Sequence, residues 1–376
     1  MTKKKKEPTL MECLEEVPDP RLERCRRHKL IDILFMALCA ILWGAEGFTE
    51  MEEFGKAKED WLGQFLEWPN GIPSHDTFRR VVGRLNPQAV EACVLRWVRG
   101  VGPWTEGQIV PIDGQTVRRS HNKAAGARAI ELVSAWAQQN RMTLGQVKVA
   151  DDSNEITAVP ELWRLLQIKG CMVTVDALNT QKETARQIRA QEAEYVLALK
   201  ENHPTLQEQV ADFLEAAQQG RTLNYEIDQH RTVDGEPGRI ETRQYVQVDA
   251  PPHLHEYEPW PDLRRVGMVE ATREINDHSS TEVRYYLSSL PVEAVRFSEA
   301  VRGHWSIENS CHWILDVVFR EDDCRVRVGY AAQNLAILRR LALSLLSQEK
   351  TLKRGVKTKR LKAALDERYL LKILMV

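Results

Sequence analysis

The stretch "VPIDGQTVRR", residues 110–119, begins with an apolar run that ends at the carboxylate of Asp113. A buried strand would be expected to continue with apolar residues, because a buried charge is costly unless it is paired or holds a metal ion. An Asp followed by Gly at the end of a strand is also a common turn sequence. Whether Asp113 has a chemical role therefore depends on which other residues lie beside it.

The composition is that of a globular protein with two basic ends. The 376 residues suffice for two or three domains, or for one enzyme domain with insertions. The formal net charge is only −2, yet the chain begins "MTKKKKE" and carries "KTLKRGVKTKRLK" at residues 350–362. Basic ends of this kind favour a polyanion as partner, although they are equally typical of solvated tails.

Cysteine usage and hydropathy indicate where the protein works. The seven cysteines are scattered and form no C-x-x-C pair, which favours a reducing cytoplasm over disulfides or a zinc knuckle. The apolar run at residues 30–45 is about sixteen residues long and contains Asp32, which favours a buried helix over a membrane span. We therefore expect a cytoplasmic protein without a membrane partner.

The first part of the chain is expected to be helical. Residues 1–20 are predicted to form a basic, disordered tail, and residues 21–105 a helical domain. Within "PSHDTFRRVVGRL", residues 73–85, the apolar side chains share one helix face and leave Arg79 and Arg80 on the other. A helical domain that displays arginines is suited to bind DNA, and a solvated basic face is the alternative.

The pattern changes to alternating strands and helices near residue 106. Residues 106–220 predict three strands, then helix, strand, helix, strand, and this order favours an α/β fold with a mixed five-stranded sheet and flanking helices. Residues 221–290 predict a β-rich insertion. Residues 291–348 return to helix, with one long helix over 292–319, and residues 349–376 form a basic C-terminal tail.

Three acidic residues could meet in this arrangement. Asp113 lies on the first predicted strand and Asp176 ends the fourth, so the two are neighbours if these strands are adjacent. Glu308 shares the spacing of Val301 and Leu315 on the long helix, which predicts that it faces inward. The simpler interpretations are two turn residues and a glutamate paired with a histidine one helical turn away.

Three adjacent carboxylates would need cations. At about 4 Å and an effective dielectric near 20, each pair repels by roughly 4 kcal/mol. Oxygen ligands without cysteine favour Mg²⁺, with Mn²⁺ as a substitute, and two such ions about 3.5–4 Å apart can promote phosphodiester chemistry. A zinc site of His304, Glu308 and His312 is disfavoured, because the two histidines would lie about 12 Å apart on one helix.

Several motifs resemble the H-repeat-associated, ISAs-type transposases of bacterial insertion sequences. They are "VPIDGQTVRRS", "SNEITAVPELWRLLQIKGCMVTVDALNTQ", "YVLALKENHPTL" and "RGHWSIENSCHWILDVVFREDDCRVR". "DPRLERCRRHKLIDILFMALCAILWG" and "PSHDTFRRVVGRLNP" are similar to the helical domain that precedes the catalytic domain in that family. The resemblance implies an RNase H-like catalytic domain with an Asp-Asp-Glu triad, carried here by Asp113, Asp176 and Glu308.

The same resemblance implies an activity and partners. The triad would hold two Mg²⁺ ions and cut and rejoin double-stranded DNA at terminal inverted repeats and target sites, with a homodimer bringing two ends together. Related cut-and-paste transposases place Tyr, Arg, Glu and Lys at positions that correspond to Val301, His304, Glu308 and Leu315, and only Glu308 is retained.

Further residues are predicted to contact DNA. Arg118 and Arg119 follow the first aspartate, Lys200 ends the fifth strand, and Arg302 with His304 could replace the missing arginine in holding phosphates. Trp305 or Trp313 could stack on a displaced base, and a core role is the alternative for both.

The sequence thus predicts a DNA transposase that would associate with the nucleoid when bound to DNA. Two alternatives remain open: a nuclease of the same fold without strand transfer, and an inactive or domesticated relic that binds DNA.

Overall fold

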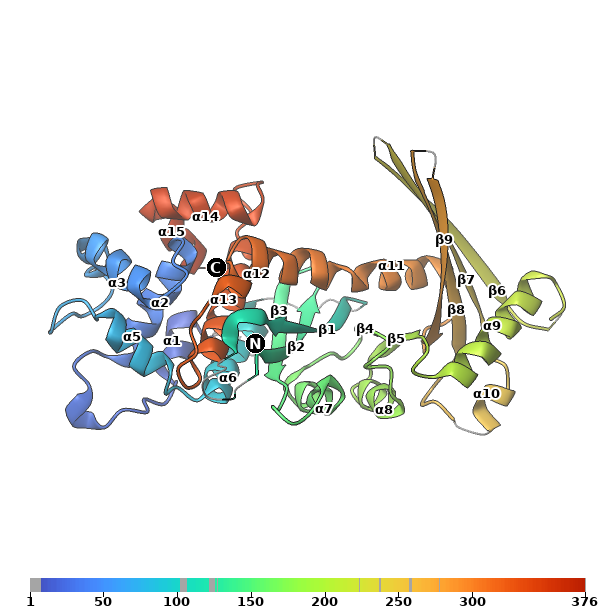
Figure 1. Ribbon diagram of the computed structural model, residues 1–376, viewed down its shortest axis with the longest axis horizontal. Helices are drawn as coiled ribbons and strands as arrows, with labels where there is room; N and C mark the ends of the chain where they lie inside the picture. The colour runs from blue at the N-terminus through green and yellow to red at the C-terminus, as the bar shows by residue number, and fades with distance from the viewer. Residues whose placement is uncertain are drawn as a thin grey trace, which may run out of the picture. The chain divides into compact units, whose positions relative to one another are not determined.

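A computed structural model of the chain describes residues 8–101, 107–121, 126, 128–222, 224–236, 238–256, 259–276 and 278–375. It shows an α/β fold with a helical N-terminal region and a large mixed sheet (Figure 1). Nine strands belong to this sheet, in the order β3-β2-β1-β4-β5-β9-β8-β7-β6. The prediction of five strands is therefore wrong, because β9 pairs with β5 and the β-rich segment extends the sheet.

The chain divides into two compact units. The first comprises Met1–Pro103, Gly114–Asn154 and Glu308–Val376, and the second comprises Trp104–Asp113 and Glu155–Ile307. The chain passes from one unit to the other inside β1 (Ile109–Val117), between Asp113 and Gly114, and again between Ile307 and Glu308.

The first unit is built around two helices that are buried on nearly all sides. Helices α2 (Leu30–Trp43) and α13 (Ala331–Gln348) bury nearly all their residues and pack against each other, which is the pattern of central core helices. The remaining helices and strands of the unit are α1 (Leu10–Glu15), α3 (Phe48–Ala57), α4 (Glu59–Leu62), α5 (His75–Val82), α6 (Pro87–Val101), β2 (Ile130–Ala137), β3 (Met142–Lys148), α12 (Trp313–Val317), α14 (Val356–Leu365) and α15 (Glu367–Leu374).

Both ends of the described chain carry helices. Helix α1 lies within the predicted disordered tail, where Leu10, Cys13 and Leu14 are buried and Thr9 forms a capping box with Glu12. Helices α14 and α15 lie within the basic C-terminal segment, and Lys359 and Arg360 are buried there. Their donors bind backbone oxygens, with Lys359 Nζ at 2.9 Å from the Leu346 oxygen. The charges of these two residues therefore serve the fold.

No single helix in the described ranges is both long and apolar enough for a membrane span. Helices α2 and α3 pass that criterion only as a pair, bent by 94°.

The second unit contains the parallel part of the sheet. It holds the first residues of β1 together with α7 (Glu155–Leu165), β4 (Met172–Val175), α8 (Lys182–Ala190), β5 (Glu194–Leu199), α9 (Pro204–Gln218), β6 (Ile227–Glu236), β7 (Arg239–Asp249), α10 (His253–Glu256), β8 (Arg265–Ile275), β9 (His278–Ser288) and α11 (Ala294–His304). Strands β1, β4 and β5 run parallel, and β9, β8, β7 and β6 continue antiparallel. All four residues of β4 are buried, as expected for a central parallel strand.

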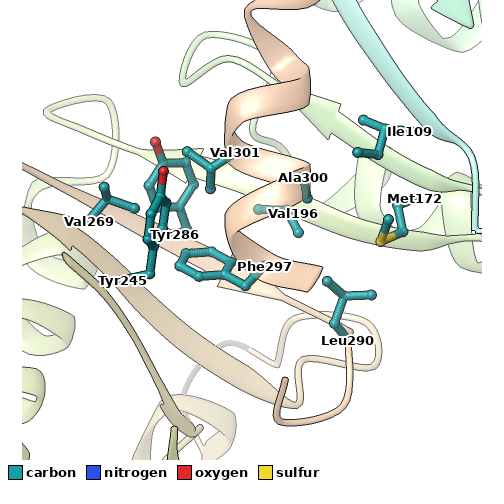
Figure 2. Packing of buried hydrophobic residues seen from close by; sticks show 10 residues of the cluster. All are labelled: Ile109, Met172, Val196, Tyr245, Val269, Tyr286, Leu290, Phe297, Ala300 and Val301. Carbon is teal, nitrogen blue, oxygen red and sulfur yellow. The ribbon is translucent and has the colours of Figure 1, made fainter. Parts of the chain in front are cut away.

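Helix α11 packs on this sheet through one apolar face (Figure 2). The ring of Phe297 lies edge-on to two tyrosines, with centroid distances of 6.3 Å to Tyr245 and 5.5 Å to Tyr286. Gly267 of β8 makes room for it, because a Cβ atom there would lie 2.7 Å from Phe297 Cζ. Ala300 and Val301 continue the same buried cluster toward the end of the helix.

We expect Gly267→Ala to destabilise the second unit by about 1–3 kcal/mol, because the added methyl group overpacks the Phe297 site. Gly235→Ala is the matched control: Gly235 also lies on a strand, and a Cβ atom there would meet nothing within 4 Å. Chemical denaturation of both variants measures the difference. Equal midpoints would contradict the close packing of Phe297 on β8.

We expect a pH-dependent loss of stability in the first unit. Burial raises the pKa of Glu91 on α6 from 4.5 to about 7, against the opposing effects of the Gln146 N–H group and Arg340. Because the folded pKa is raised, this stabilisation is full below pH 4.5 and is lost as the pH rises through 7. Glu91→Gln keeps the acceptor for the Gln146 N–H and cannot ionise. Between pH 5 and 8, the free energy of unfolding of the wild type should fall by about 2–3 kcal/mol more than that of this variant. Parallel curves of unfolding free energy against pH would refute the prediction.

Candidate active site

The two predicted aspartates lie on neighbouring parallel strands. In the register of β1 and β4, Ile112 is opposite Val175, so the next position on each strand brings Asp113 opposite Asp176. Adjacent strands lie about 4.8 Å apart, and opposite residues point to the same face. Both aspartates are half-buried. Two carboxylates therefore occupy one place at the end of the parallel sheet in the second unit.

Asp176 is held by the turn that follows β4. Its Oδ1 atom accepts hydrogen bonds from the backbone N–H and the side-chain amide of Asn179, both at 3.0 Å. The same amide donates to Glu155 Oε2 at 3.1 Å, and Asn179 is fully buried. The buried amide thus fixes the orientation of the Asp176 carboxylate and leaves its Oδ2 atom without a hydrogen bond among the described residues.

The end of α11 lies over the same face of β4. Thr174, two residues before Asp176, shares a hydrogen bond of 3.0 Å between its Oγ1 atom and Nδ1 of His304. Thr174 is buried, so this contact is shielded from water. Because Phe297, Ala300 and Val301 anchor α11 in the core, the position of His304 is set by packing as well as by this bond.

A small pocket adjoins Asp176 in the second unit. It has a volume of about 100 Å³, and its polar lining consists of Thr174, Asp176, Lys200, Arg284 and His304, with Trp305 and Tyr286 beside them. The guanidinium carbon of Arg284 lies 5.2 Å from the ring centroid of Trp305. Trp305 is 47% exposed, so it does not belong to the core, and its ring is accessible for stacking.

Glu308 is the first residue of a π-helix, Glu308–His312, in the first unit. Its side chain is 53% exposed, so the prediction that it faces inward on a regular helix is wrong. The helix is irregular here, and Ile307 and Cys311 are buried in place of Glu308, whereas Val301 and Leu315 are buried as predicted. Trp313 is likewise exposed.

His312 lies beside Glu308. Its Nδ1 atom is 3.8 Å from Glu308 Oε2, and the imidazole is almost completely buried. Burial lowers the pKa of His312, against the opposing effect of Glu308. The neutral imidazole that results is the form that binds metal ions. Glu308 and His312 thus offer one carboxylate oxygen and one ring nitrogen in close proximity.

Most arginines predicted to contact DNA already have acidic partners. Arg118 Nε lies 3.2 Å from Asp322, Arg119 Nη1 lies 3.4 Å from Asp323, and Arg79 Nη2 lies 3.1 Å from Asp76. Arg302 pairs with Asp234. Lys200 and Arg80 are exposed, and Arg80 Nε donates to the backbone oxygen of Asp76 at 3.1 Å.

Sequence reasoning did not identify the residues that position the carboxylates. Asn179 stands three residues after Asp176, and this spacing is a recognisable signal because Asp side chains often accept from the backbone in such turns. Thr174 stands two residues before Asp176, and residues two apart on a strand point to the same face, so this signal was also present in the sequence. The pairing of Glu308 with His312 follows the i,i+4 spacing that the sequence offered as the simpler interpretation, whereas no local pattern indicates the contact of Arg284.

Comparisons with known proteins agree over nearly the whole chain. The family model described as "Transposase DDE domain" matches residues 104–345, and the one described as "DDE_Tnp_1-associated" matches residues 11–98. The chain is 38% identical to "Putative transposase YncI" of Escherichia coli O157:H7, over 97% of this chain and 94% of that protein.

Two further comparisons concern a relative and a solved structure. "H repeat-associated putative transposase YhhI" of Escherichia coli K12 is 37% identical to this chain, and the match covers 97% of each protein. A solved piggyBac transposase synaptic complex with hairpin DNA overlaps 95% of this chain and 76% of its own, with a TM-score of 0.43 and 11% identity. The matches of the two family models and the two sequence relatives place this chain in the H repeat-associated family of DDE transposases.

Proposed function

We propose that this transposase binds transposon ends and catalyses metal-dependent hydrolysis and strand transfer of DNA through Asp113, Asp176 and Glu308, on an RNase H-like catalytic domain. The observation that carries the proposal is the register of β1 and β4, which sets Asp113 opposite Asp176. Two carboxylates at this spacing, each only half-buried, repel one another unless a cation lies between them.

The ligand atoms fit a hard divalent cation. In the second unit, Asp113 and Asp176 present two neighbouring carboxylates, and in the first unit Glu308 and His312 together offer a carboxylate oxygen and a ring nitrogen. Three carboxylates without a thiolate favour Mg²⁺, with Mn²⁺ as a substitute. When bound, a pair of such ions activates the attacking oxygen and stabilises the leaving oxygen of a phosphodiester.

The surrounding side chains would bind and orient the DNA strand. Lys200 supplies positive charge to the pocket beside Asp176, where Arg284 is paired with Glu282, and the exposed ring of Trp305 offers a stacking surface for an unpaired base. His304 would hold a phosphate oxygen with one ring nitrogen while Thr174 fixes the other. Arg79, Arg80, Arg118, Arg119 and Arg302 would contact the backbone of double-stranded DNA, and a homodimer would hold two ends.

We expect Asp113→Asn to abolish cleavage of duplex DNA taken from the flanks of the coding region. The amide is isosteric with the carboxylate but cannot balance the charge of a cation, so the loss should reach at least about a hundredfold, the scale of a single preorganised charge. Gel analysis of nicked and cut products, with Mg²⁺ or Mn²⁺ present, measures the effect.

The matched control is Asp152→Asn, which removes the same charge from an exposed turn. It should cleave like the wild type. The wild type should also gain thermal stability with Mn²⁺, and Asp113→Asn should gain less. Full cleavage by Asp113→Asn would exclude the proposed role of this residue.

A nuclease without strand transfer is the second candidate. The observation that favours it is Leu315, which stands where related transposases have lysine and is fully buried, so the side chain cannot reach DNA. Pre-cut ends supplied with a target plasmid distinguish the two functions. The transposase should join these ends to the plasmid, whereas a pure nuclease would leave them unjoined.

A further inference from the structure

A cavity of about 690 Å³ lies between residues 21–28 and α5, in the first unit. Its charged lining consists of Arg21, Arg24, Arg27, Arg80 and Arg84, His28 lies beside them, and no acidic residue is among the described residues that line it. The hydroxyl groups of Ser74 and Thr77 add two further hydrogen-bonding groups. The cavity is thus a concentration of positive charge on a chain whose net charge is −2.

The walls of the cavity are held rigidly by the fold. Arg21 is buried, pairs with Asp19 at 2.8 Å and donates to the backbone oxygen of His28 at the same distance. Asn70 donates to the backbone oxygen of Arg27 at 2.6 Å. On the opposite wall, buried Phe78, Val81 and Val82 fix α5 against the core. Arg80 and Arg84, one turn apart, therefore face the cavity from a fixed scaffold.

The positive charge of the cavity is largely uncompensated. Arg24, Arg27 and Arg84 form no ion pair with any acid in the part of the chain that the structure describes. These three side chains contrast with Arg118, Arg119 and Arg302, each of which has an acidic partner. Neighbouring guanidinium groups repel each other, so an anion that lies between them removes a cost as well as forming hydrogen bonds.

His28 provides an independent indication of a ligand. It is only 7% exposed, it lines the cavity, and its buried Nδ1 atom has no hydrogen-bond partner among the described residues. Buried polar atoms in folded proteins are nearly always satisfied by protein, water or ligand. An oxygen atom of a bound phosphate would satisfy this nitrogen.

We propose that this cavity binds phosphate groups of a DNA backbone and so anchors the transposon end to the helical N-terminal region. The inference rests on the proposed function, which makes DNA the substrate. Arginine presents paired N–H donors that match phosphate oxygens. The cavity has no Phe, Tyr or Trp in its lining to stack a base and no acid to read one, so it contributes affinity rather than sequence specificity.

Cys25 allows the site to be tested directly. It lines the cavity and is exposed, whereas the other six cysteines are buried. Duplex DNA bound in the cavity should therefore slow alkylation of Cys25 by iodoacetamide, read by mass spectrometry. Labelling at an unchanged rate with saturating DNA would overturn the proposal.

The decisive variant is Arg24→Ala/Arg84→Ala, compared with Arg164→Ala/Arg221→Ala, which removes two exposed arginines elsewhere. Affinity for a labelled thirty-base-pair duplex is titrated in EDTA at several salt concentrations. The cavity variant should lose about tenfold in affinity, and the slope of log K against log salt should fall by about two. It should also lose the DNA protection of Cys25, while the control keeps both.

Replacement by lysine adds a test of geometry. Arg24→Lys/Arg84→Lys keeps the charge but loses the paired donors, so it should recover the salt slope and only part of the affinity. Thermal melting should be unchanged in every variant, and the lysine variant decides the outcome if the alanine variant does not fold.

Other outcomes separate this proposal from the proposed function. Unchanged affinity and salt slope in the alanine variant would overturn the cavity site even if the wild type cuts DNA. Cavity-dependent binding without cleavage by the wild type would overturn the catalytic proposal alone. If the alanine variant lost binding to phosphatidylserine vesicles but kept its affinity for DNA, the cavity would be assigned to a lipid headgroup. If the wild type did not bind DNA at all, both proposals would be overturned.

Discussion

The parallel pairing of β1 with β4 is the constraint on which the candidate site depends. A shift of one residue in this register would turn Asp113 to the opposite face of the sheet from Asp176. The buried residues of both strands oppose such a shift, because it would move either Asp113 into the buried position of Ile112 or Ile112 out to the half-buried position of Asp113. The hydrophobic core therefore selects the relative position of two charged groups that it does not itself contain.

The packing of α11 likewise sets the position of a histidine at the candidate site. Phe297 occupies the space left by Gly267 and packs edge-on against Tyr245 and Tyr286, and this contact anchors the helix on the sheet. At that end, His304 meets Thr174, which shares a strand face with Asp176. A buried aromatic contact thus sets the approach of a histidine to a carboxylate. In the first unit, a buried ion pair fixes a cationic side chain: the carboxylate of Glu321 lies 3.1 Å from the guanidinium group of Arg340.

The sequence predicted the parts of this arrangement that depend on simple periodicity. The apolar runs that end at Asp113 and Asp176 are strands, and these strands are neighbours, as expected for an α/β order. The inward orientation of Glu308 was predicted wrongly, because a regular 3.6-residue period was assumed where the chain forms a π-helix. The extension of the sheet by β9 and the burial of Lys359 depend on contacts distant in sequence, which local patterns do not reveal.

Charge composition is a poor guide to where DNA would bind on this chain. The totals of 52 basic and 54 acidic residues nearly cancel, and the pairing of each arginine decides its effect. An exposed ion pair such as that of Arg118 contributes only about 0–1 kcal/mol, so a phosphate can displace the carboxylate at small cost. Arg24, Arg27 and Arg84 form no ion pair with the residues that the structure describes and so need no such exchange, and their field extends about 8 Å at physiological salt. Phosphates approaching the first unit should therefore meet these residues first, and the paired arginines should engage only when the strand is already close.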